Sequence, residues 1–115
     1  MAIDTTILAA YHDVMQQLLN LLNQAYNGAP NLDAEIAINN VADAVSAILT
    51  QLNQQGLADD TAQLQALQTS VNEINAQLVA AQKQVNTWVK DLGAAAQIAG
   101  IMDKAVQLAG TVFTA

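Results

Sequence analysis

The feature that most constrains this chain is a heptad-spaced series of apolar residues in its second half. The series steps by three and four residues throughout: Leu64, Leu67, Val71, Ile74, Leu78, Ala81, Val85, Trp88, Leu92. This spacing places every one of these side chains on a single face of an α-helix, at about 3.5 residues per turn. Such a stripe has to be covered by other helices, so the sequence predicts an all-α protein with packing like that of a coiled coil.

Helix-breaking residues divide the chain into four predicted helices. The strongest break is the segment 27–30, where glycine and proline stop a helix, and Gly56 marks the second. We expect Gly28 to adopt the left-handed conformation of a C-terminal cap. Gly93 is the third and weakest break. The predicted helices cover about 5–26, 32–54, 60–92 and 95–113.

The starts of these helices carry residues suited to N-caps. Asp4 precedes the first helix, and either Asn31 or Asp33 is expected to cap the second. Asp60 and Gln63 match the spacing of a capping box at the start of the third.

The chain is therefore predicted to form a single domain, 1–115, folded as an antiparallel up-down-up-down four-helix bundle. At about 1.5 Å per residue the third helix would be near 50 Å long, against roughly 35 Å for the first two, and part of it would protrude. An alternative arises because the apolar series continues in phase beyond Gly93, through Ala95, Ala99, Met102, Val106, Ala109 and Phe113. The chain would then have three helices, with the last running over about 60–113.

Charge and composition exclude several classes of function. The net charge is −7, with three lysines and no arginine, so the chain lacks the cationic surface that nucleic-acid binding needs. Cysteine is absent, which excludes disulfides and thiolate chemistry. The first residues lack the basic region of an ordinary secretory signal. We expect a cytoplasmic protein, or alternatively one exported without a cleavable signal peptide.

No pattern in the sequence indicates catalysis, a cofactor or a metal. His12 is the single histidine, and Asp13 follows it directly, so the two side chains point about 100° apart on a helix. The two glutamates, Glu35 and Glu73, lack the histidine three residues on that a di-metal bundle requires. We expect no catalytic, cofactor-binding or metal-binding residues, and no enzymatic activity.

The C-terminal segment 94–113 is apolar over most of its circumference and is the best candidate for function. The residues expected to make contacts lie in this segment and at the end of the preceding predicted helix: Val85, Trp88, Leu92, Ile98, Ile101, Met102, Val106, Leu108 and Phe113. The sequence predicts a non-catalytic interaction or assembly protein that buries its apolar series against a partner helix or another copy, as a homo-oligomer. The alternative is a membrane-active protein of the pore-forming or secreted type that inserts 94–113, although membrane contact is not favoured.

Overall fold

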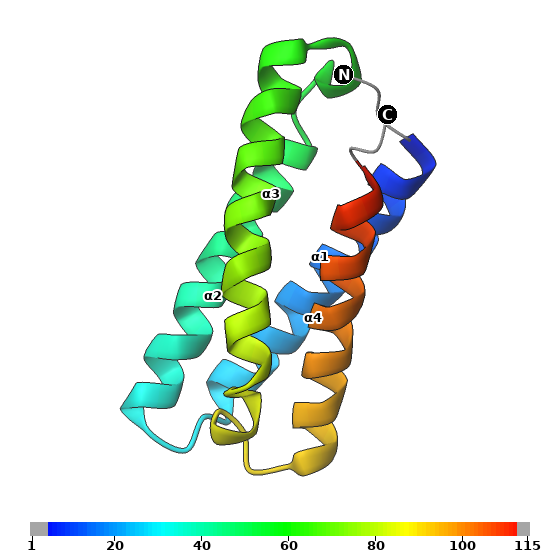
Figure 1. Ribbon diagram of the computed structural model, residues 1–115. Coiled ribbons are helices and arrows are strands. Elements are labelled where there is room, and N and C mark those ends of the chain that lie inside the picture. The colour runs from blue at the N-terminus through cyan, green and yellow to red at the C-terminus, as the bar shows by residue number, and fades with distance from the viewer. Residues whose placement is uncertain (1–4, 113–115) are drawn as a thin grey trace.

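The computed structural model describes residues 5–112, which form an antiparallel up-down-up-down four-helix bundle, as predicted (Figure 1). The helices are α1 (Thr5–Asn27), α2 (Leu32–Leu52), α3 (Thr61–Gln82) and α4 (Leu92–Val112). Two short 3₁₀-helices, η1 (Leu57–Asp59) and η2 (Val85–Thr87), lie in the connections on either side of α3.

The helices form a ring in which each packs against its neighbours in the chain and α1 also packs against α4. The bundle is a rod with extents of 44 × 19 × 19 Å. We call one end of the rod the loop end, because the connections 28–31 and 83–91 lie there (Figure 1). At the opposite end, α1 begins, α4 ends and the chain passes from α2 to α3 (Figure 1).

The apolar series of each helix faces a common core. In α3 the whole predicted series is buried, from Leu64 at 3% exposure to Ala81 at 5%. The core is built mainly from aliphatic side chains and alanine, together with Tyr11, Trp88 and two methionines. The alanines let the helix backbones approach closely. The most deeply buried large side chains include Tyr11, Met15, Leu18, Leu22, Ile38, Ile48, Leu67, Leu78 and Met102.

The prediction of a long third helix over 60–92 is wrong, because α3 ends at Gln82. The segment 86–89 consists of asparagine, β-branched and aromatic residues, which have weak helix propensity. The Thr87 hydroxyl also donates a hydrogen bond to the backbone carbonyl of Gln84 (2.6 Å) and supports the tighter turn. No half of α3 is therefore left protruding from the bundle within the described residues.

The helix η2 keeps the apolar series buried across this break. Val85 and Trp88 are only 1% and 2% exposed, and the Trp88 N–H donates to the Val85 carbonyl (3.0 Å). Residues three apart share a face in a 3₁₀-helix and lie close on one face in an α-helix, so the spacing suits both. Leu92 is the first member of the series to leave the core, and it is 72% exposed.

The alternative of one helix over 60–113 is also wrong, because a new helix begins at Leu92. The Asp91 carboxylate accepts hydrogen bonds from the backbone N–H groups of Gly93 (2.8 Å) and Ala94 (3.3 Å). These bonds satisfy donors that the first turn of a helix leaves free. The chain therefore breaks before Gly93 rather than at it.

Side-chain caps start α2 and α3. Asn31, rather than Asp33, caps α2 by accepting from the Ala34 N–H (2.8 Å), and Asp60 accepts from the Gln63 N–H (3.0 Å). The capping box is half formed, because the Gln63 side-chain oxygen is buried with no hydrogen-bond partner in residues 5–112. The predicted cap at Asp4 lies outside the described residues.

Gly28 does not adopt the predicted left-handed conformation. Its N–H donates to the Ala25 carbonyl (3.2 Å) and closes α1 with an ordinary turn. The positive φ occurs instead at Gly56 (73°), before η1, where a side chain would strain the backbone.

Tyr11 places a polar group in the core. Its ring is 1% exposed, and its hydroxyl has no hydrogen-bond partner within the described part of the chain. Burial raises the pKa of the Tyr11 phenol above its usual value of about 10, because removal from water disfavours the phenolate. A buried hydroxyl without a partner costs stability.

Replacing Tyr11 by phenylalanine is expected to raise the free energy of unfolding at neutral pH by about 1–3 kcal/mol, because the unpaired hydroxyl is removed. The gain should grow above about pH 10, since a phenol with a raised folded pKa contributes stability below its unfolded pKa and loses it as the pH rises. Urea titrations at neutral pH and at about pH 11 measure both effects. The exposed Tyr26 provides the control, and Tyr26→Phe should change stability by less than about 0.5 kcal/mol. A less stable Tyr11→Phe protein would contradict this account.

Candidate interaction surface

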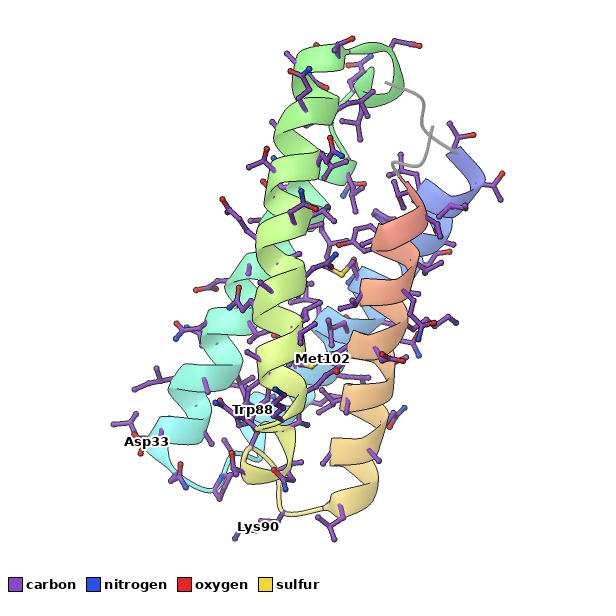
Figure 2. The ribbon with its side chains drawn as sticks, viewed as in Figure 1. Asp33, Trp88, Lys90 and Met102 are labelled. Atoms are coloured by element: carbon purple, nitrogen blue, oxygen red, sulfur yellow. The ribbon has the colours of Figure 1, made fainter. Side chains whose placement is uncertain are left out.

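The structure separates the residues that the sequence grouped as contact residues. Four of them lie in the bundle core: Val85, Trp88, Ile98 and Met102. Three are partly buried and pack against that core: Ile101, Val106 and Leu108. Leu92 is exposed, and Phe113 lies outside the described residues. Most of the predicted set is therefore covered by the chain's own helices, as Figure 2 shows for Trp88 and Met102.

The exposed large hydrophobic side chains of residues 5–112 gather instead at the loop end. They come from all four helices: Tyr26 (43% exposed), Leu32 (67%), Ile36 (50%), Val79 (45%) and Leu92 (72%). Each belongs to the last turn of α1 or α3 or to the first two turns of α2 or α4. No large hydrophobic side chain of the described residues is exposed at the opposite end.

Four of these five side chains were not predicted as contact residues. Leu32 and Ile36 are four residues apart and out of phase with the buried series of α2 that contains Ile38 and Val41, which was the signal available in the sequence. Val79 directly follows the buried Leu78, so its phase alone placed it outside the core.

Three shallow depressions surround the loop end. One, of about 340 Å³, lies between the start of α2 and η2 and includes Asp33 and Trp88 in its lining. Another, of about 260 Å³, lies between η2 and the first turns of α4 and is lined by Val85, Leu92 and several alanines. The third, of about 150 Å³, lies between α1 and α4. The loop end therefore carries both exposed apolar side chains and recesses between its helices.

The loop end also carries charges of both signs. Lys83 and Lys90, two of the three lysines of the chain, lie in the connection from α3 to α4. Asp33 and Glu35 lie in the first turn of α2, where they also interact favourably with the helix dipole. Figure 2 shows Asp33 and Lys90 at separate positions of this end, pointing outward.

The single histidine lies near the opposite end, in an open depression of about 300 Å³ between α1 and the end of α2. His12 Nε2 lies 3.1 Å from Asn53 Oδ1, which ties α1 to the residue following α2. Its Nδ1 lies 3.7 Å from Asp13 Oδ1, which is too far for a hydrogen bond. The two side chains nevertheless lie closer together than their angular separation of about 100° on the helix suggested. This arrangement links two helices, and the other polar side chains that line the depression are those of Thr5 and Asp13.

Residues 5–112 contain neither a metal-binding cluster nor a membrane-spanning helix. No three side chains of the histidine and carboxylate types come together as a group that could hold a metal ion. None of the helices there has the length and apolar character needed to cross a bilayer.

The chain matches no protein-family model, no curated protein and no solved structure. No relative therefore supplies an activity, a ligand or a partner. Its function is inferred from the arrangement of its own residues.

Trp88 and Leu92 should respond oppositely to truncation, although both belong to the same apolar series. Trp88→Ala removes a core ring and is expected to lower the free energy of unfolding by about 3–5 kcal/mol. Leu92→Ala should change it by less than about 0.5 kcal/mol, because this side chain is already in water. Urea titration of both variants measures the difference. A large loss in Leu92→Ala would show that Leu92 is buried within the bundle.

Proposed function

We propose that this chain is a non-catalytic helical interaction module that binds protein through its loop end. The observation that carries the proposal is the gathering there of Tyr26, Leu32, Ile36, Val79 and Leu92. Covering exposed apolar surface is favourable by roughly 25 cal/mol per Å² removed from water. Exposed large apolar side chains that gather in one region of a folded protein are typical of an interaction site.

The burial of the apolar series favours the loop end, rather than a helix face, as the contact site. The series of α3 and the inner face of α4 are already buried against the other helices. A partner helix could reach them only by displacing a helix of the bundle. The loop end needs no such rearrangement, and so we place the contact there.

The polar residues around the loop end are also suited to burial in a contact. Several of them are uncharged amides that are exposed: Asn27, Asn31, Gln84 and Asn86. Removing an amide from water costs less than removing a charge, and an amide can form new hydrogen bonds with a partner.

Insertion of α4 into a bilayer is less favoured. The six buried residues of α4 would first have to separate from α1 and α3: Ala95, Ile98, Met102, Ala105, Ala109 and Val112. The loop-end contact requires no such loss of core packing.

Site-specific photo-crosslinking tests the proposal. The chain has no cysteine, so Asn86→Cys places one benzophenone label beside Leu92, and Ser46→Cys places the matched label on the outer face of α2. In an extract of the native host, the label at 86 is expected to give a discrete protein adduct, and the label at 46 is not. Excess unlabelled wild type should change that adduct: it lowers an adduct to a different protein by competition, and it raises an adduct to a second copy by supplying more of the partner. An unlabelled variant combining Leu32→Gln and Leu92→Gln should do neither. Equal adducts from both labels, or an adduct at 86 that excess wild type leaves unchanged, would overturn the proposal.

A further inference from the structure

We infer that the partner at the loop end is a second copy of this chain, and that two copies meet loop end to loop end about a two-fold axis. This inference rests on the proposed function and identifies the partner of the same surface. Three features of the loop end support it: its paired charges, the recess beside Leu92, and the contrast with the opposite end.

The loop end carries two lysines, Lys83 and Lys90, and three carboxylates, Asp33, Glu35 and Asp91, so it can form ion pairs with a copy of itself. Lys83 and Lys90 form no ion pair with a carboxylate of residues 5–112. Asp33 is exposed and likewise unpaired in that part of the chain. In a two-fold contact, a pair between one residue and another occurs twice. Lys90 of each copy can therefore face Asp33 of the other, and both pairs form at once.

The shape of the loop end is self-complementary as well. Leu92 is largely exposed to solvent and forms one edge of a recess, whose other lining residues are Gln82, Lys83, Val85, Asn86, Ala95, Ala96 and Ala99. In the proposed two-fold dimer, Leu92 of each copy lies opposite the recess of the other copy. The small alanine side chains leave room for that leucine.

The opposite end of the bundle cannot supply the partner surface. Its charged groups within residues 5–112 are the carboxylates of Asp59 and Asp60 in the connection from α2 to α3. Two such ends repel each other. A head-to-tail contact would set the apolar loop end against a polar surface and bury its leucines poorly. The arrangement in which both copies use their loop ends avoids both costs.

The size of the contact sets its strength. The rod is 19 Å wide in both directions across its axis, so an end-to-end contact is smaller than the roughly 1,200–2,000 Å² of a standard stable interface. We therefore expect a weak and reversible dimer, with dissociation in the micromolar to millimolar range (about 10⁻⁵ to 10⁻³ M).

Charge exchange with the purified full chain tests the inference. Lys90→Asp alone and Asp33→Lys alone each produce two like-charge pairs across the two-fold axis, so each should raise the dimer dissociation constant about tenfold. An equimolar mixture of the two variants places opposite charges at both contacts and should restore dimers, now containing one copy of each. Sedimentation equilibrium from about 10 μM to about 1 mM measures all three samples.

Control variants carry the same charge changes away from the loop end. Asp43 and Lys104 are exposed on the middle of α2 and α4, so Asp43→Lys and Lys104→Asp should leave the dimer unchanged. Leu92→Gln should abolish the dimer while circular dichroism shows an intact bundle. A wild-type protein that stays monomeric at about 1 mM, or that grows beyond a dimer, would overturn the inference, as would a mixture that fails to restore association.

These results separate the two proposals. A monomer in sedimentation together with a competed adduct of another protein at position 86 would overturn the dimer and support the proposed function. A dimer in sedimentation that is unaffected by Leu92→Gln and by the charge exchanges would place self-association elsewhere and overturn the dimer proposed here. Absence of any adduct from the label at 86, both in the extract and with the purified chain at about 1 mM, would overturn both.

Discussion

The packing of Trp88 at the loop end is the interaction on which the form of that end depends. The ring is almost fully buried and lines a recess together with Ala34 and Ala37 of α2. Because η2 holds it there, the chain turns inward before it can extend α3. After this turn, Asp91 caps the start of α4, and the side chain of Leu92 points into solvent. One buried aromatic side chain thus fixes where the last helix begins and which leucine faces solvent.

The fold was predictable because helix packing is recorded in the periodicity of apolar residues. The series of α3 is buried as expected, and the break between α1 and α2 falls where glycine and proline stand. The break after Gln82 was not predictable from periodicity, since Val85 and Trp88 share a face in either type of helix. Local chemistry decided it, through the weak helix formers at 86–89 and the aspartate that caps α4.

The candidate surface was harder to predict than the fold. Whether an apolar side chain is covered depends on where the chain turns, and a helix end exposes residues that the middle of the same helix would bury. Leu92 belongs to the predicted contact set and is exposed, whereas Val85, seven residues earlier in the same apolar series, lies in the core. Leu32 and Ile36 are exposed for a different reason: their positions along α2 fall outside its buried series, so their side chains point away from the other helices.

The position of the two outer helix ends has a mechanical consequence. α1 begins and α4 ends at the side of the rod remote from the loop end (Figure 1). Any segment joined to either helix would leave from that side and would not obstruct the loop end. In a pair of bundles in contact through their loop ends, such segments would emerge at the two extremities, about twice the 44 Å rod length apart. The pair would then act as a strut that holds two tethered bodies at a fixed separation.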